Sequence, residues 1–177
     1  MANPEFPEFI KFKARLFDVK DVQVTLADGK PRSYEMVDIS DAVMLLPVDA
    51  ENNVYFVEQF RIGAKRSLLE LPAGKIEPEE NPDATALREL REETGMAASD
   101  LTLIGKFYMS PGYSTEYMYC YLARGLYPAP LDPDADEFIA LRKLPLQAVL
   151  NMISRGEIED SKTLAAFSLA RALLKSD

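Results

Sequence analysis

The chain has 177 residues, a length that fits one domain with a substantial buried core. Its formal net charge of −9 argues against binding to nucleic acid or to anionic membranes, because both partners require a basic protein surface. The sequence contains no histidine, which excludes His-based catalytic triads and His-ligated zinc.

Cysteine usage and hydropathy bear on the cellular compartment. A single cysteine, Cys120, cannot form an internal disulfide, which fits a reducing environment. We find no signal peptide and no apolar stretch long enough to cross a bilayer. The expectation is a soluble cytoplasmic protein in which Cys120 is a small core residue.

The first half of the chain predicts strands, because β-branched and aromatic residues mix with polar ones between turn signals. The segment Ala27-Asp28-Gly29-Lys30 is typical of a hairpin connection, since Asp-Gly accepts the positive φ of a tight turn. The predicted strands cover residues 13–19, 22–26, 32–39, 42–47 and 54–59.

The segment Gly74–Met96 carries the most specific pattern in the chain. It reads Gly, five residues, Glu, seven residues, then Arg-Glu-apolar-x-Glu-Glu-x-Gly-apolar. Asn81 and Pro82 predict a helix start, because asparagine caps free backbone donors and proline fits the first helical position. The helix should run to about Thr94, and Gly95 should end it in the left-handed conformation.

A helical wheel divides this helix into a packing face and an acidic face. Hard divalent cations prefer oxygen ligands, so two or three carboxylates on one helical face suit Mg²⁺. The alternative for an arbitrary helix of this composition is a solvated, charge-rich surface. The packing face is predicted to hold Asp83, Leu87, Leu90 and Thr94, and the acidic face Glu89, Glu92 and Glu93.

After this helix we predict further strands near residues 101–108 and 117–123, then helices at 146–154 and 161–175. Strands, a helix, strands and then helices, in that order, are typical of an α+β fold or an α/β/α sandwich with a mixed sheet.

The Gly74–Met96 pattern has the spacing of the Nudix box, and the chain resembles the Nudix hydrolase superfamily. The resemblance implies an α/β/α sandwich with a mixed sheet, preceded here by a small N-terminal antiparallel sheet region. It implies that Arg88 pairs with a box glutamate, for which Glu80 is the candidate. It also implies Mg²⁺ as cofactor, with Mn²⁺ as the alternative, held by the carbonyl of Ala73 and the carboxylates of Glu89, Glu92 and Glu93.

Features outside the box resemble the ADP-ribose pyrophosphatase branch of that superfamily. Pro111 lies 16 residues after Gly95, an offset typical of the branch, and we expect it to contact substrate. Residues 57–61 and 156–163 also match the branch, so the resemblance covers most of the chain. It implies hydrolysis of a nucleoside-diphosphate sugar, with ADP-ribose cleaved to AMP and ribose 5-phosphate.

The resemblance also implies substrate-binding residues. Arg61 and Arg32 would hold the diphosphate or the terminal ribose, because guanidinium groups match phosphate oxygens. Glu116 would hydrogen-bond ribose or base from the partner subunit, and Phe17 would stack on adenine. Tyr113 lies on a loop, where functional groups concentrate. For Arg32 and Phe17, a surface charge and a core aromatic are equal alternatives.

The acidic loop 132–137 is a candidate source of the general base that would take a proton from the attacking water. The alternative is that the loop is merely a solvated acidic segment. In the branch, this loop supplies a metal-associated carboxylate, which aligns with Glu137, and a general base two residues earlier. That earlier position holds Ala135, so the chain departs from the pattern. The base is therefore left open among Asp134, Asp136, Glu137 and Glu92, with Glu92 and Glu137 as the leading candidates.

The resemblance divides the chain at residue 38. Residues 1–38 are expected to form a strand region that exchanges across a homodimer, and residues 39–177 the hydrolase domain. Exposed strand edges need a partner or a cover, which makes a dimer reasonable. The rival functions are the same chemistry on GDP-mannose, a dinucleoside polyphosphate or a nucleoside triphosphate, and a non-catalytic ADP-ribose sensor.

Overall fold

The structure, a computed structural model, describes residues 6–132 and 139–174. Asp134, Ala135, Asp136 and Glu137, and with them most of the acidic loop, lie outside the described residues. The chain forms two compact units. The first comprises the chain up to Asp41 together with Tyr108–Tyr117, and the second comprises Ala42–Phe107 together with the chain from Met118 onward.

The first unit is built on a three-stranded antiparallel sheet in the order β1-β2-β3. The Asp28-Gly29 hairpin is confirmed, with Gly29 at a φ of 77°. The predicted strand 13–19 is wrong, because the chain reverses there and the N–H of Ala14 donates to the carbonyl of Phe17 at 3.0 Å. The apolar pair Leu16 and Phe17 resembles strand sequence but lies exposed in the turn. The strands are β1 (Glu8–Lys13), β2 (Asp18–Thr25) and β3 (Pro31–Asp38).

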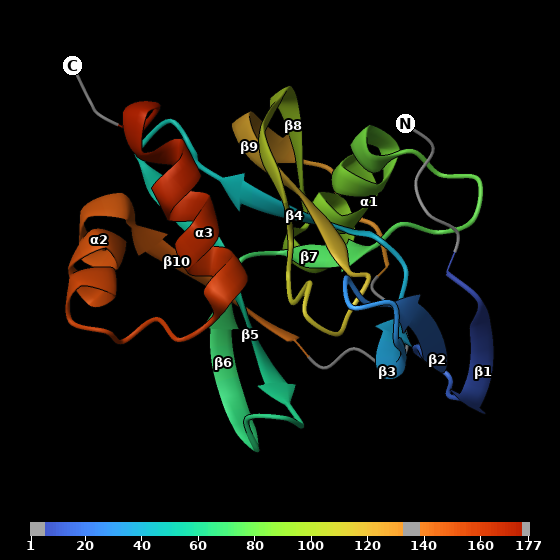
Figure 1. Ribbon diagram of the computed structural model, residues 1–177. Helices are drawn as coiled ribbons and strands as arrows, with labels where there is room; N and C mark the ends of the chain where they lie inside the picture. Colours follow the sequence, from blue (N-terminus) through green and yellow to red (C-terminus); the bar gives the residue numbers. More distant parts are fainter. Residues whose placement is uncertain (1–5, 133–138, 175–177) are drawn as a thin grey trace. The chain divides into compact units, whose positions relative to one another are not determined.

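The second unit contains two sheets (Figure 1). One is four-stranded and mixed, in the order β7-β4-β9-β8, with β4 parallel to β9 and antiparallel to β7. The other is three-stranded and antiparallel, in the order β10-β5-β6. The strands are β4 (Ala42–Pro47), β5 (Asn53–Arg61), β6 (Arg66–Glu70), β7 (Ala73–Lys75), β8 (Met96–Tyr108), β9 (Tyr117–Pro128) and β10 (Ile139–Pro145).

Helices cover the strands of the second unit from two sides, and this layering confirms the predicted sandwich. Figure 1 shows α1 (Pro82–Thr94) on one side and α2 (Leu146–Ser154) and α3 (Ser161–Leu169) on the other. The bounds of α1 and α2 agree with the prediction. Helix α3 ends earlier than predicted, because the backbone tightens into a 3₁₀ turn at Ala170–Ala172, as is common at helix ends.

Both ends of α1 form as its sequence predicts. The Asn81 side chain accepts a hydrogen bond from the N–H of Ala84 at 2.9 Å, which caps the first turn. Gly95 ends the helix at a φ of 71°, a conformation that glycine adopts without strain.

The predicted faces of α1 are only partly correct. Leu90 and Thr94 are buried, as predicted. Leu87 is 38% exposed, however, whereas Glu89 and Glu93 are only 7% and 6% exposed. The helix packs on β4 and β7 through a stripe that includes these two glutamates beside Ala86 and Leu90. The wheel set these carboxylates apart from the packing face, but here the surrounding chain supplies hydrogen-bond donors that allow their burial.

The core beneath α1 joins the helix to the mixed sheet through apolar contacts. Its members are Val43, Leu45, Ala86, Leu90, Tyr121 and Ala123. Cys120 is buried, as predicted, and burial raises the pKa of its thiol to about 12. None of the helices within residues 6–132 and 139–174 is long and apolar enough to span a membrane.

The two leucines of α1 test this correction. Leu90→Ala should lower the free energy of unfolding by about 2–5 kcal/mol, because it leaves a cavity in the core. The matched change Leu87→Ala should cost less than about 1 kcal/mol, because that side chain is partly exposed. Urea unfolding of the two variants measures the difference. Equal losses would contradict the assigned orientation of α1.

Candidate functional site

The acidic side of α1 lies against the short strand β7. The N–H of Ala73 donates to Glu93 Oε2 at 2.9 Å, so the strand backbone stabilises that buried carboxylate. A Cβ atom at Gly74 would overlap the carboxylate of Glu89. Any larger residue at position 74 would therefore displace the carboxylate of Glu89 from its present place.

Arg88 holds three carboxylates at the same end of the site. Its Nε donates to Glu80 Oε1 at 2.9 Å, which confirms the predicted Arg88–Glu80 pair. Its Nη1 donates to Glu89 Oε1 at 2.8 Å and to Glu92 Oε2 at 2.7 Å. The guanidinium thus offsets the mutual repulsion of acidic residues that the helix brings together.

This pairing changes the protonation of Glu80. The hydrogen bond from Arg88 is the main cause, and a second bond, from the Thr85 hydroxyl at 2.8 Å, adds to it. Together they lower the pKa of Glu80 to about 2. Glu80 is therefore ionised throughout the range in which the protein would work.

The donor chemistry of this region fits a hard divalent cation, which prefers carboxylate and carbonyl oxygens. Glu89 and Glu93 lie one helical turn apart, both buried, beside the backbone of β7. Within the described ranges, no three acidic side chains converge closely enough to form a metal cluster. Two of the predicted ligands, Glu89 and Glu92, are paired with Arg88, and Glu137 lies outside those ranges.

A second charged network surrounds Glu70, at the end of β6. Arg61 donates from Nε and Nη2 to the two oxygens of Glu70, each at 2.7 Å. Lys162 Nζ also donates to Glu70, and it donates to Asp160 at 2.8 Å. Glu70 is only 1% exposed; burial alone would raise its pKa, but the bonds from Arg61 and Lys162 outweigh that effect and lower the pKa.

The two networks are electrostatically connected. Hydrogen bonding to Glu70 is the largest cause of a raised pKa for Arg61, and the negative charge of Glu93 adds to it. Arg61 therefore lies near enough to the acidic side of α1 to interact with it.

The remaining predicted substrate residues belong to the first unit. Arg32 is exposed and donates to the carbonyl of Pro31 at 3.0 Å. Phe17 and Tyr113 are exposed, so the alternative of Phe17 as a core aromatic is wrong. The N–H of Glu116 donates to the Ser114 hydroxyl at 3.2 Å. Pro111 is exposed on the same loop, whose carbonyl at Tyr113 accepts a 2.7 Å bond from the N–H of Val37 in β3.

Sequence reasoning did not single out Glu70, Lys162 or Asp160. A local signal for one of them exists, since Asp160 stands directly before α3, where a capping residue is expected, and it accepts from the N–H of Thr163 at 2.9 Å. No local signal indicates the Glu70–Lys162 contact, which joins residues 92 positions apart.

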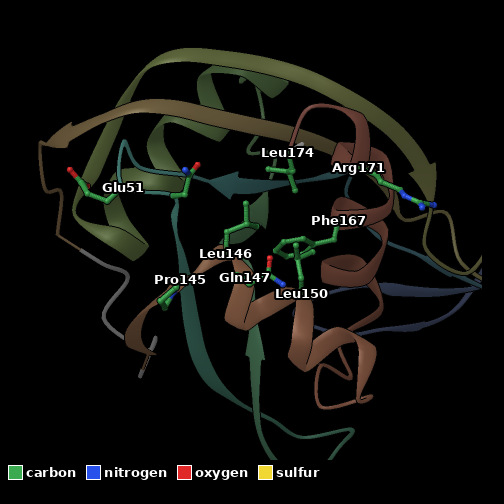
Figure 2. A pocket seen from close by; sticks show the side chains of 9 residues that line it. Glu51, Pro145, Leu146, Gln147, Leu150, Phe167, Arg171 and Leu174 are labelled. Carbon is green, nitrogen blue, oxygen red and sulfur yellow. The ribbon is translucent and has the colours of Figure 1, made fainter. Parts of the chain in front are cut away.

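A hollow of about 700 Å³ lies elsewhere in the second unit. Figure 2 shows it between α2, α3 and the segment before β5, with Leu146, Leu150 and Phe167 lining its apolar part. None of the box residues lines this hollow, so it is separate from the acidic site.

Comparisons with known proteins agree with this geometry. Residues 38–167 match the NUDIX domain family. The chain is 38% identical over 157 residues to an ADP-ribose pyrophosphatase of Bacillus subtilis, covering 88% of this chain and 85% of that protein. It is 30% identical over 165 residues to the ADP compounds hydrolase NudE of Escherichia coli, covering 92% and 88%. A crystal structure of an ADP compounds hydrolase superposes with a TM-score of 0.86 at 28% identity, covering 98% of this chain and 95% of that one.

The depressed pKa of Glu80 predicts an acid-dependent stability. Because its folded pKa lies below the usual value near 4.5, the Arg88–Glu80 pair contributes its full stability above that pH. The contribution should be lost as the pH falls from about 4.5 to about 2. The wild type should therefore exceed Glu80→Gln in free energy of unfolding at pH 7, and the difference should shrink towards pH 2.

Denaturant unfolding at a series of pH values measures this difference. The matched control is Glu79→Gln, which changes an exposed carboxylate of the same loop and should follow the wild type at every pH. If the difference in free energy of unfolding between the wild type and Glu80→Gln stayed constant from pH 7 to pH 2, the stabilisation would not depend on the charge of Glu80.

Proposed function

This chain belongs to the NUDIX family, and we propose that it is a Mg²⁺-dependent hydrolase that cleaves the diphosphate of a nucleoside-diphosphate sugar, with ADP-ribose as the substrate and AMP and ribose 5-phosphate as the products. Two similar proteins whose names refer to ADP-ribose or ADP compounds support this choice of substrate. The observation that carries the proposal is the burial of Glu89 and Glu93 beside β7, where the negative charge of Glu93 also acts on Arg61.

Most of the residues proposed to hold the cation lie on α1 and β7, and Glu137 lies outside the described residues. A bound divalent cation would neutralise phosphate charge and acidify the attacking water. Mg²⁺ suits an all-oxygen donor set, and Mn²⁺ is the alternative. The proposed ligands are the carbonyl of Ala73 and the carboxylates of Glu89, Glu92, Glu93 and Glu137.

The chain's own residues orient the substrate. Arg61 binds diphosphate oxygens, because its guanidinium presents a planar set of donors and keeps its charge at every working pH. Arg88 keeps Glu89 and Glu92 oriented through the bonds described above. Water attacks one phosphorus of the diphosphate, the bond from that phosphorus to the bridging oxygen breaks, and the bridging oxygen leaves with the other phosphate. The proton of the water passes to a carboxylate, for which Glu92, Asp136 and Glu137 are the candidates.

The first unit is proposed to recognise the rest of the substrate. Arg32, Phe17 and Tyr113 are accessible for this role, since all three are exposed. Strand β1 also exposes a row of apolar residues, including Phe9 at 58% and Phe12 at 61%, which suits burial against a second copy of the chain. We therefore propose a cytoplasmic homodimer in which residues 1–38 exchange and Glu116 and Pro111 complete the partner's site.

The acidic helix provides the sharpest test of the reaction. Glu93→Gln should lower kcat for ADP-ribose hydrolysis with Mg²⁺ by about 10³-fold or more, because it removes a negative ligand while keeping the bond from Ala73. Glu79→Gln is the matched control and should retain full activity, since Glu79 is exposed and is not among the proposed ligands. Circular dichroism and the melting temperature establish that both variants fold. A near wild-type rate in folded Glu93→Gln would overturn the metal assignment.

A substrate panel tests the specificity. With Mg²⁺, the wild type should release AMP from ADP-ribose faster than it hydrolyses GDP-mannose, a dinucleoside polyphosphate or ATP. The assay follows nucleotide products by chromatography and phosphate release after phosphatase treatment. A faster reaction with another substrate would replace ADP-ribose in the proposal. Binding of ADP-ribose without hydrolysis of any substrate would favour the sensor.

A further inference from the structure

We propose that Lys162 is a positioning residue for diphosphate recognition: it neutralises the buried Glu70, so that Arg61, which is held by the same carboxylate, keeps its positive charge available to the substrate. The proposal rests on the role of Arg61 in the proposed function. Lys162 belongs to α3, and its two ion pairs are with Glu70 and Asp160.

The Glu70 carboxylate orients Arg61 without occupying all of its hydrogen-bond donors. The two bonds from Arg61 use Nε and Nη2, which are on one side of the guanidinium. A guanidinium has five N–H donors, and the two on Nη1 take no part in this pairing. The Arg61 side chain is 41% exposed, whereas that of Glu70 is 1% exposed. Glu70 thus orients Arg61 from the interior, while the other end of the guanidinium can meet an anion.

The charges of the cluster balance only when Lys162 is counted. Arg61 and Lys162 supply the two cations, and Glu70 and Asp160 supply the two carboxylates that contact them. Without Lys162, the same cluster would carry a net negative charge, to which the negative charge of Glu93 would add at Arg61. That field would repel a diphosphate and would hold the guanidinium more tightly on Glu70.

The start of α3 fixes Lys162 in place. Asp160 accepts from the N–H of Thr163 at 2.9 Å and from its hydroxyl at 2.6 Å, which caps the helix. The Thr163 hydroxyl in turn accepts from the N–H of Leu71 at 3.0 Å. Lys162 is nearly buried between these groups and can reach both Glu70 and Asp160. The first turn of α3 is therefore attached to Glu70 and to the segment that leads into β7.

Binding of ADP in the absence of divalent metal tests the proposal without relying on turnover. Titration calorimetry in EDTA compares the wild type with Lys162→Met, Glu70→Gln, the double variant and Arg61→Met. Lys162→Met should weaken ADP binding by about tenfold, because Glu70 then lacks its second cation. The double variant should return to within about threefold of the wild type, because it removes the charge that Lys162 balances together with Lys162 itself.

The double variant distinguishes electrostatics from structural support. If Lys162 served only to pack α3, the losses of the single variants would add and the double variant would bind ADP worst; that result overturns the proposal. Unchanged ADP affinity in folded Lys162→Met also overturns it. If Lys162→Met does not fold, the folded double variant decides by the same comparison with the wild type. Ser168→Ala, an exposed change in α3, serves as the matched control and should bind ADP like the wild type.

Two further measurements complete the test: steady-state kinetics with Mg²⁺, and the ADP affinity of Arg61→Met. Lys162→Met should raise KM for ADP-ribose about tenfold and change kcat less than threefold, because Lys162 acts on binding through Arg61. A loss confined to kcat would contradict the proposal. If Arg61→Met bound ADP as tightly as the wild type, Arg61 would not be part of the binding site and the role of Lys162 would be contradicted. The proposed hydrolysis is tested separately, by turnover of the wild type and of Glu93→Gln.

Discussion

The burial of acidic side chains on α1 is the constraint on which the rest of the site depends. Glu89 and Glu93 are four residues apart, an arrangement that is unfavourable by a few tenths of a kcal/mol even on an exposed helix. Burial makes unpaired charges far more costly. Arg88 and the backbone N–H of Ala73 offset that cost by donating to these carboxylates. Such bonds form only if β7 lies close to the helix, and Gly74 permits that approach. One electrostatic requirement thus explains the arginine, the glycine and the short strand together.

Glu70 is also a buried carboxylate that is stabilised by paired cations, but the numbers of cations and carboxylates are reversed there. At Arg88 one cation serves several carboxylates, whereas at Glu70 one carboxylate is shared by two cations. The first arrangement leaves negative character next to β7, which suits a divalent cation. The second leaves an outward-facing guanidinium end, which suits a phosphate. Both are built on strands and helices of the second unit, so the groups proposed to act on a metal–diphosphate pair are held by rigid elements.

Much of α1 and its pairing could be predicted because the signals are local. Asn81, Pro82 and Gly95 specify the helix ends through backbone chemistry within a few residues. The resemblance to the Nudix box implied the Arg88–Glu80 pair, and the structure contains it. Where several solutions fit the local pattern, prediction failed: the run that contains Leu16 and Phe17 has strand composition but forms a turn, and the wheel placed Leu87 inside and Glu89 outside. In both cases pairing with other parts of the chain, and not the local composition, decided the outcome.

The sequence by itself determined the local features of the box: a capped helix, the carboxylates spaced along it, and an arginine on the same segment. The helix ends follow from residue type and spacing along one continuous segment. Only the tertiary structure decided that Glu89 and Glu93 are buried, that Arg61 shares Glu70 with Lys162, and that Thr163 supports the segment before β7. The physical reason is distance along the chain. Charge balance at Glu70 depends on residues 92 positions apart, and no local propensity encodes which distant side chains will meet when the sheets and helices pack.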